Sequence, residues 1–356
     1  MEKEKLKIGI TQGDINGIGY EVILKAFSDS RVLEIFTPII YGSSKVAGYY
    51  KKALELPNVN FNIILNADQV HTKRINLINC TDEDVKIEVG RSTPEAGKAA
   101  FAALDRATYD LENGKIDALV TAPINKNNIQ SDNFSFPGHT EYLEEKFGAE
   151  SSSLMMLVSD YLRVAVVTGH IPLKDVSSAI TKDLIIKKLS ILNDSLKKDF
   201  TLVRPRIAVL GLNPHAGDNG LIGSEEEEVI IPAINESFDN GILCFGPYAA
   251  DGFFGSDKFM KFDGVLAMYH DQGLIPFKSM AMDNGVNFTA GLPIIRTSPD
   301  HGTAYDIAGK NQASELSLLQ AIYLACDIHK NRAFHEEINA NPLPITEAKR
   351  DTRKIE

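Results

Sequence analysis

The chain has 356 residues, 44% of them hydrophobic and 24% charged, and a formal net charge of −11. This length favours two domains, and the acidic balance argues against a nucleic-acid partner, because phosphate backbones require a basic face. We find no signal peptide, no apolar run near the ~18 residues that span a bilayer, and no C-x-x-C pair among the three cysteines, so we expect a cytoplasmic protein with free thiols and no membrane contact.

Apolar runs and amphipathic stretches alternate along the chain. The pattern predicts strands at 7–11, 38–41, 117–121, 153–158, 163–167, 207–210, 265–267 and 286–290. It predicts helices at 19–28, 45–54, 92–113, 181–196, 225–238 and 316–329, and a polar surface tail at 341–356. We interpret Ser92 and Glu95 as a capping box and residues 297–299 as a turn. This alternation indicates an α/β fold with a parallel or mixed sheet covered by helices.

The turn after the first predicted strand is rich in glycine but does not match the dinucleotide-binding fingerprint. Gly17 and Gly19 fit the G-x-G-x-x-G pattern, whereas Val22 occupies the third glycine position. No acidic residue ends a second strand about 20 residues further on. We therefore predict no Rossmann-type nucleotide site at this turn, and the chain has no Walker A sequence.

Three histidines each follow an apolar run that we predict as a buried strand: His170, His215 and His270. In α/β proteins, ligands bind at the carboxyl ends of parallel strands. Three imidazoles brought to that edge would suit one divalent metal such as zinc or cobalt. The alternative is that each is an ordinary hydrogen-bonded loop histidine, but their equivalent positions favour a shared metal.

Charged residues follow the last of these histidines. Asp271 is a candidate to orient His270 or to contact a substrate. Lys278 and Arg296 near a metal would indicate recognition of a carboxylate or phosphate, unless Lys278 is an ordinary solvated lysine.

Two further segments have both a functional and a structural interpretation. His139 and Thr140 open a predicted helix whose free N–H groups suit an anion, unless Thr140 is a simple N-cap. Glu225 and Glu226 either contact the substrate or merely begin a helix, whose dipole they complement.

Several segments in chain order together resemble the 4-hydroxythreonine-4-phosphate dehydrogenases, a family of pyridoxal phosphate biosynthesis. They are Thr11-Gln12-Gly13-Asp14 with Gly17-Ile18-Gly19, Thr121-Ala122-Pro123-Ile124-Asn125-Lys126, Gly138-His139-Thr140-Glu141, Thr168-Gly169-His170, Asn213-Pro214-His215-Ala216-Gly217, Tyr269-His270-Asp271-Gln272-Gly273 and Asp300-His301-Gly302-Thr303-Ala304. The chain departs from the family at Ile15 and Tyr20, where prolines are usual.

The resemblance implies a fold like that of isocitrate and isopropylmalate dehydrogenases, with two α/β domains around a central cleft. We expect one domain to comprise residues 1–130 plus 298–356 and to contain the NAD-binding segment. The second, residues 131–297, is expected to hold the metal and substrate site and the interface of a homodimer with a shared active site.

The resemblance also implies roles for particular residues. It implies one divalent metal (zinc, magnesium or cobalt) on His170, His215 and His270 of the partner subunit. It implies substrate contacts by His139, Thr140, Asp251, Asp271, Lys278, Asn287 and Arg296, with Lys278, Asp251 and Asp271 as candidates for the catalytic base. It implies NAD or NADP binding by residues 301–311, including His301, Gly302, Thr303, Ala304, Asp306 and Asn311.

The implied reaction is oxidation of 4-phosphooxy-L-threonine at C3 by NAD, followed by decarboxylation to 3-amino-2-oxopropyl phosphate. Related dehydrogenases that oxidise phosphorylated threonate or erythronate, or a dihydrodiol carboxylate, remain alternatives. So does a zinc hydrolase, because a three-histidine metal also activates water. An acyl-phosphate transferase and a non-catalytic binding protein are further alternatives, and saturable NAD binding would separate a dehydrogenase from a hydrolase.

Overall fold

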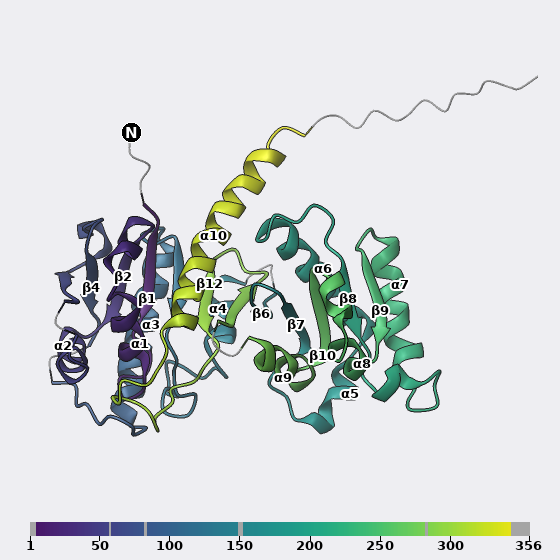
Figure 1. Ribbon diagram of the computed structural model, residues 1–356, viewed down its shortest axis with the longest axis horizontal. Helices are drawn as coiled ribbons and strands as arrows, with labels where there is room; N and C mark the ends of the chain where they lie inside the picture. The colour runs from purple at the N-terminus through teal and green to yellow at the C-terminus, as the bar shows by residue number, and fades with distance from the viewer. Residues whose placement is uncertain (1–4, 57, 82–83, 149–151, 282–283, 343–356) are drawn as a thin grey trace, which may run out of the picture.

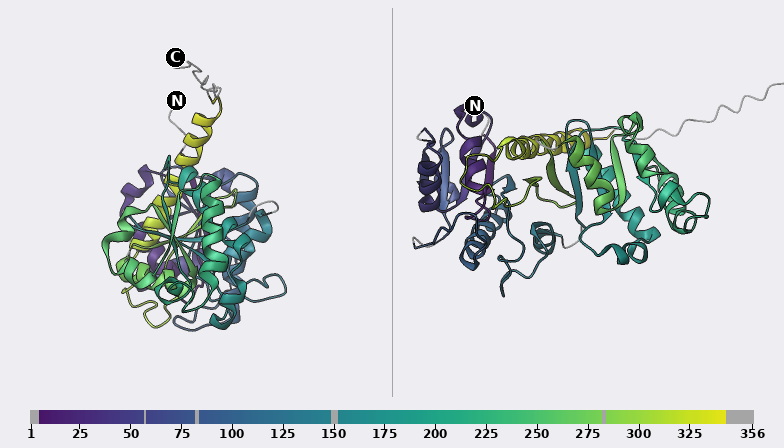
Figure 2. Two further views of the ribbon diagram at one scale, coloured as in Figure 1. Left: turned by 90° about the vertical axis from the view of Figure 1, so that its right-hand side faces the viewer. Right: turned by 60° about the horizontal axis from the view of Figure 1, so that its bottom comes forward.

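The computed structural model describes residues 5–56, 58–81, 84–148, 152–281 and 284–342. Within them, a 12-stranded mixed sheet has the order β3-β4-β2-β1-β5-β12-β11-β6-β7-β10-β8-β9. The sheet runs across the whole molecule, with helices against both faces (Figures 1 and 2). The α/β fold predicted from the alternating pattern is therefore confirmed.

The first part of the chain builds one parallel half of the sheet. Its strands are β1 (Lys7–Thr11), β2 (Thr37–Gly42), β3 (Phe61–Ile64), β4 (Ile75–Asn79) and β5 (Ala118–Thr121). Its helices are α1 (Gly19–Ala26), α2 (Ser44–Ala53) and α3 (Pro94–Glu112). The buried apolar residues of β1, β2 and β5 explain why these strands occupy the middle of this half.

The middle of the chain builds the other half. Its strands are β6 (Leu154–Val158), β7 (Arg163–Thr168), β8 (Ile207–Leu210), β9 (Cys244–Tyr248) and β10 (Gly264–Tyr269). Its helices are α5 (Val176–Ala179), α6 (Lys182–Lys198), α7 (Ile231–Asp239), α8 (Ala250–Phe254) and α9 (His270–Met280). Helix α4 (His139–Phe147) precedes them in the chain and packs against the first half. Strands β7, β10, β8 and β9 are parallel neighbours in that order.

Two strands join the halves into one sheet. Strand β12 (Arg296–Pro299) pairs in parallel with β5 and antiparallel with β11 (Val286–Ala290), which pairs antiparallel with β6. The last helix, α10 (Leu316–Asn339), packs across β12, β5 and β11. It crosses the middle of the molecule and extends beyond the sheet (Figure 1).

The two faces of the sheet are covered differently. On one face, a continuous apolar core includes residues of α1, α2, α6, α7 and α10. On the other face, α3 and α4 cover the first half and α8 and α9 the second, as two separate cores. Because strand side chains alternate between faces, Val286 and Phe288 join the continuous core, and Asn287 points to the face with the divided cover.

The structure corrects several predicted local features. The N-cap of α3 is Thr93, whose hydroxyl accepts from Ala96 N at 3.2 Å, so the capping box at Ser92 and Glu95 is wrong by one residue. Residues 297–299 belong to β12 and are not a turn, because all three pair with β11 and Thr297 also pairs with β5. The helix predicted at 225–238 begins as a π-helical turn, Glu226–Ile230. The predicted polar tail lies almost entirely outside the described residues.

The sequence pattern also missed four strands, β3, β4, β9 and β12, and the last ten residues of α10. Strands β3 and β4 contain Asn62, Asn76 and Asn79, so they lack a continuous apolar run; β3 forms the edge of the sheet and β4 is its neighbour. Strand β9 contains Gly246 and Pro247 and forms the opposite edge. No helix within the described ranges is both long enough and apolar enough to cross a membrane.

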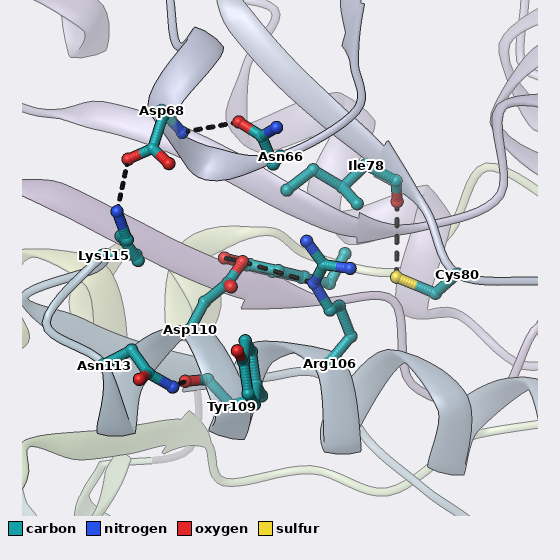
Figure 3. Close-up of polar contacts among 10 residues, drawn as sticks. Asn66, Asp68, Ile78, Cys80, Arg106, Tyr109, Asp110, Asn113 and Lys115 are labelled. Carbon is teal, nitrogen blue, oxygen red and sulfur yellow. Dashed lines mark hydrogen bonds and ion pairs between the residues drawn. The ribbon is translucent and has the colours of Figure 1, made fainter.

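Polar contacts fasten α3 to the sheet (Figure 3). The buried carboxylate of Asp110 accepts from Tyr41 Oη at 2.8 Å and lies 3.5 Å from Arg106 Nε. Nearby, Cys80 Sγ donates to Ile78 O at 3.4 Å, and burial raises the pKa of this thiol to about 12. All three cysteines are free, as predicted.

Candidate active site

A cavity of about 290 Å³ lies on the face of the sheet with the divided cover. Its walls are the carboxyl ends of β5, β7, β10 and β12, the start of α4, and residues of β6, β11 and α9. Three cations line it, namely Lys126, Lys278 and Arg296, against two carboxylates, Glu141 and Asp300. With its histidines neutral, the cavity is positive although the whole chain is acidic, which suits an anionic small molecule.

Strand pairing brings two of the three predicted metal-binding histidines together. His170 and His270 follow the parallel neighbours β7 and β10, in which Thr168 pairs with Tyr269. The Thr168 hydroxyl ties the two strand ends by donating to Met268 O at 2.8 Å. The two imidazole rings consequently lie with their centroids 5.5 Å apart, both lining the cavity.

The third histidine follows β8, the strand on the other side of β10. The three strand ends are thus neighbours, but His215 is exposed and does not line the cavity. Among the described residues, no group of three or more His, Cys, Asp or Glu side chains is placed to hold a metal ion. The shared metal site therefore remains a prediction.

The two adjacent histidines have the surroundings that metal-binding imidazoles usually have. His270 Nδ1 lies 2.7 Å from Asp271 Oδ1, and His170 Nδ1 lies 3.8 Å from Glu141 Oε1. A carboxylate at one ring nitrogen fixes the tautomer and leaves the other nitrogen free to bind a metal. The donor chemistry fits two ligands of a divalent ion, and a third would have to come from His215 or from another chain.

The loop that carries His215 has an unusual backbone. Every residue from 215 to 220 has a positive φ, between 43° at Asp218 and 83° at Gly220. Glu226, which is buried, accepts at 2.7 Å from both Leu212 N and Asn213 N at the base of this loop. Glu226 therefore holds the base of the loop in place. This role differs from both predictions for the residue, a substrate contact and the start of a helix.

Arg296 is the most deeply buried cation of the cavity. Its side chain donates to two hydroxyls on neighbouring strands, Thr121 Oγ1 at 2.7 Å and Thr289 Oγ1 at 3.2 Å, and contacts His139 Nδ1 at 3.3 Å. Burial lowers its pKa to about 10. All these partners are neutral, so within the described residues the guanidinium has no carboxylate in hydrogen-bonding contact, and a bound anion would neutralise it.

The start of α4 adjoins this arginine. His139 is its first residue and Thr140 the second, and no side chain caps the helix at Gly138, so Thr140 is not an N-cap. His139 Nε2 and Asn287 Oδ1 are buried atoms without a hydrogen-bond partner. Burial, together with Arg296 and Lys126, holds the pKa of His139 well below its ordinary value. A neutral imidazole, an amide oxygen and the N-terminus of α4 thus line the cavity next to a buried cation, and the Glu141 carboxylate accepts from its own backbone N–H there.

The three candidates for the catalytic base occupy different places. Lys278 lines the cavity, and its Nζ lies 3.0 Å from Asp300 Oδ1. Burial raises the pKa of Asp300. Asp271 contacts His270 from an exposed position, whereas Asp251 is exposed on α8, beside the turn Pro214–Gly217 that carries His215.

The segment predicted to bind NAD is an ordered loop without helix or strand. Its first two residues, His301 and Gly302, line the cavity. Burial lowers the pKa of His301, whose Nε2 has no partner. The predicted cofactor residues therefore begin at the wall of the predicted substrate site and lead away from it.

The glycine-rich first turn serves as the support of this loop. Ile18 N donates to Thr303 O at 3.0 Å, and a Cβ added to Gly17 would lie only 2.7 Å from the same oxygen. The buried carboxylate of Asp14 accepts from Tyr305 Oη at 2.7 Å. Further along, the buried Glu21 accepts from Ala313 N at 2.9 Å and Gly309 N at 3.2 Å. Here the glycines allow backbone contact and do not serve a Rossmann site.

Sequence reasoning gave no role to several residues that the structure brings to the site or its supports. Lys126 and Glu141 lie beside His170, Asp300 beside Lys278, and Asp14 and Glu21 beneath the loop at 301–313. Four of these five belong to the segments that carry the family resemblance. Their charge and their place after predicted strands were available signals, but their partners depend on strand order.

The sheet order and the position of the cavity define an α/β protein of the isocitrate dehydrogenase type of fold. A crystal structure of isocitrate dehydrogenase from Methylococcus capsulatus superimposes with a TM-score of 0.50 at 12% identity, over 94% of this chain and 89% of that one. A crystal structure of 4-hydroxythreonine-4-phosphate dehydrogenase from Klebsiella pneumoniae superimposes with a TM-score of 0.79 at 34% identity, over 92% of this chain and 100% of that one.

Sequence comparison identifies the family within that class. Residues 34–325 match the family model described as "Pyridoxal phosphate biosynthetic protein PdxA", and the chain belongs to this family. It is 59% identical over 343 residues to the 4-hydroxythreonine-4-phosphate dehydrogenase of Bacteroides thetaiotaomicron, covering 96% of this chain and 94% of that protein. It is 41% identical over 325 residues to a provisionally named D-threonate 4-phosphate dehydrogenase of Oceanobacillus iheyensis, covering 90% and 97%.

Proposed function

We propose that this protein oxidises 4-phosphooxy-L-threonine at C3 with NAD or NADP and decarboxylates the product to 3-amino-2-oxopropyl phosphate, in pyridoxal phosphate biosynthesis. The observation that carries the proposal is the buried Arg296, which has only neutral partners in a positive cavity next to paired histidines. The names of similar proteins support the substrate class.

The substrate phosphate would lie at the N-terminus of α4, beside Arg296, His139 and Thr140. An anion there restores the charge balance of the buried guanidinium and gains charge-assisted hydrogen bonds. Asn287 Oδ1, which is buried without a partner, would accept from an N–H or O–H of the substrate. These contacts would fix C3 and its hydroxyl relative to the two histidines.

In the reaction, the C3 hydroxyl loses its proton and C3 transfers a hydride to the nicotinamide ring, giving a β-keto acid and the reduced cofactor. The carboxyl group then leaves as CO2, and a proton is added to the carbon that it leaves. A divalent ion held by His170, His215 and His270, two of them from one chain and one from its partner, would stabilise negative charge on the C3 oxygen. Of the three candidates for the base, Lys278 has the strongest support, because it lines the cavity and neither Asp251 nor Asp271 does.

The cofactor would bind along the loop at 301–311, with its nicotinamide end toward His301 and Gly302 at the cavity wall. The adenosine end would lie among Thr303, Ala304, Asp306 and Asn311. Support for this direction comes from the anchoring of the loop by Asp14 and Glu21, which holds residues 303–313 against the first half of the sheet.

We further propose that the active site is shared between two copies of the chain. The elements next to the histidine-bearing strand ends expose large apolar side chains: Leu173 is 73%, Leu221 79% and Ile275 63% exposed. A second copy covering this surface would remove it from water. His215 and Asp251 lie outside the cavity of their own chain. In a dimer, the second chain would bring a histidine or a carboxylate to the cavity of the first.

A direct assay tests the proposal. Purified protein is analysed for bound metal and then given NAD or NADP with 4-phosphooxy-L-threonine, 4-phospho-D-threonate or 4-phospho-D-erythronate, while the reduced cofactor is followed by its absorbance. We expect saturable turnover with the phosphorylated amino acid, and loss of turnover after metal removal. Faster turnover with phosphothreonate would favour the second candidate, which the relative from Oceanobacillus iheyensis suggests. Hydrolysis without NAD binding would contradict both and favour a zinc hydrolase.

A further inference from the structure

Lys126 is a cation of the cavity that the reaction above does not use. It follows β5 in the segment Thr121 to Lys126, and its side chain is exposed at the cavity wall. Its Nζ lies 3.3 Å from His170 Nε2. The other nitrogen of that ring, Nδ1, faces the Glu141 carboxylate at 3.8 Å, which favours the tautomer with the proton on Nδ1 and the lone pair on Nε2.

The same lysine adjoins the uncapped start of α4. A Cβ built on Gly138 would lie 3.6 Å from Lys126 Cε and 4.0 Å from its Nζ. The helix has nine residues and begins at His139, whose buried Nε2 has no partner, and the buried Arg296 contacts the same imidazole. Lys126 is thus within a side-chain rotation of two positions, one at an imidazole lone pair and one at the proposed phosphate site.

We propose that Lys126 alternates between these two positions. In the metal-free chain its ammonium donates to His170 Nε2, and once a metal is bound it donates to the substrate phosphate. A neutral imidazole has one acceptor lone pair, so His170 Nε2 binds either the ammonium or a metal ion. Metal loading therefore releases Lys126, and a flexible ammonium is well suited to a phosphate. This inference rests on the proposed function and assigns the chain a phosphate-binding residue beyond Arg296, His139 and Thr140.

The substitution Lys126→Met tests the inference, because it removes the charge and keeps the length of an exposed side chain. We expect zinc or cobalt to bind about two- to fivefold more tightly without substrate, since a competing cation of an exposed pair is lost. We expect the KM for 4-phosphooxy-L-threonine to rise about tenfold or more, since a charge-assisted hydrogen bond is lost. Metal affinity is measured by competition with a chelator, and KM by release of the reduced cofactor.

Two further variants complete the test. Lys146→Met removes an exposed lysine near the other end of α4, outside the cavity lining, and should change neither quantity. Lys126→Arg keeps the positive charge and should reduce both effects. Opposite changes in metal affinity and substrate affinity would support the alternation, because a merely structural lysine would weaken both or neither.

The outcomes separate this inference from the proposed function. Unchanged or weaker metal binding in Lys126→Met, or an unchanged KM, would overturn the alternation while wild-type turnover left the proposed function intact. A wild-type chain that binds metal but shows no turnover with any of the phosphorylated substrates would contradict the proposed function, and the alternation with it.

Discussion

Two buried arginines in this chain have opposite surroundings. Arg332 is 9% exposed and pairs with the buried carboxylate of Asp199, Nε to Oδ1 at 2.6 Å. Arg296 is 3% exposed, and its hydrogen-bond partners at the cavity are neutral: two threonine hydroxyls and the imidazole of His139. A buried cation that already has a carboxylate partner serves the fold, whereas one with only neutral partners is available to an anionic ligand. The difference decides which of the two belongs to the candidate site.

Substitution of each arginine by methionine should therefore have different effects. Arg332→Met leaves Asp199 buried and unpaired, and we expect the free energy of unfolding to fall by about 3–5 kcal/mol with an unchanged substrate KM. Arg296→Met removes a cation with neutral partners. We expect its unfolding free energy to change by less than about 1 kcal/mol while KM rises at least about tenfold.

Urea denaturation of the ligand-free protein and steady-state kinetics provide the two measurements. Each variant serves as the control of the other, since both lose a buried guanidinium. If Arg296→Met were the less stable of the two and kept its KM, Arg296 would be a structural residue and the anion site would have to lie elsewhere.

The sequence predicted single residues of the cavity where they follow a buried strand. The rule that strand ends carry ligands selected His170 and His270, which lie together. The same rule selected His215, but the left-handed loop 215–220 displaces this side chain from the cavity, and no composition pattern indicates such a loop. Asp251 was assigned to the site by the family resemblance, and within its own chain it does not line the cavity.

Among the elements, the loop at 301–313 and the first turn form one unit. Neither segment has regular secondary structure between 301 and 313 or between 12 and 18. Asp14 and Ile18 of the turn hydrogen-bond to Tyr305 and Thr303 of the loop, and Glu21 in the following helix α1 accepts from Gly309 and Ala313. Sequence pattern predicted the buried central strands because their apolar runs are long. It missed β3 and β9, which form the two edges of the sheet and are partly buried, and β4, whose run is interrupted by asparagines although the strand is buried.

The substitution Glu21→Gln tests whether this unit supports cofactor binding. The two oxygens of Glu21 accept from Gly309 N and Ala313 N. Glutamine replaces one of these oxygens with an NH2 group, which cannot accept, so the loop loses a hydrogen bond. We expect the KM for NAD to rise about tenfold and the KM for the phosphorylated substrate to stay within about twofold.

Hydrogen exchange should report faster exchange of the amides at 309 and 313 in the same variant. The exposed Glu112→Gln, at the end of α3, provides the matched control and should alter neither KM. Equal losses of affinity for cofactor and substrate would mean that Glu21 acts on the whole fold and not on the cofactor loop.

For the whole molecule, the exposed apolar side chains next to the histidine-bearing strand ends suggest a surface that another copy covers. Ile275→Asp places a charge on α9 at the centre of this region, and we expect a monomer in light scattering, because burial of an unpaired carboxylate opposes association. We also expect loss of turnover if the active site is shared.

Leu65→Asp is the comparison, because Leu65 is 80% exposed in the other half of the molecule, next to β3. This variant should keep the mass and turnover of the wild type. A monomeric Ile275→Asp protein with full turnover would show that a single chain is sufficient, and a dimeric one would place the contact elsewhere.

The uninterrupted pairing from β5 through β12, β11 and β6 passes directly beneath the cavity. Two bodies joined by a flexible tether can rotate freely, but two bodies joined by a ladder of backbone hydrogen bonds can only bend or twist together. Opening and closing around a reactant would then have to bend or twist these ladders, of which the shortest joins β12 to β5 over two residue pairs. Such a scaffold would keep the reacting groups in register through every turnover and leave large excursions to side chains at its rim.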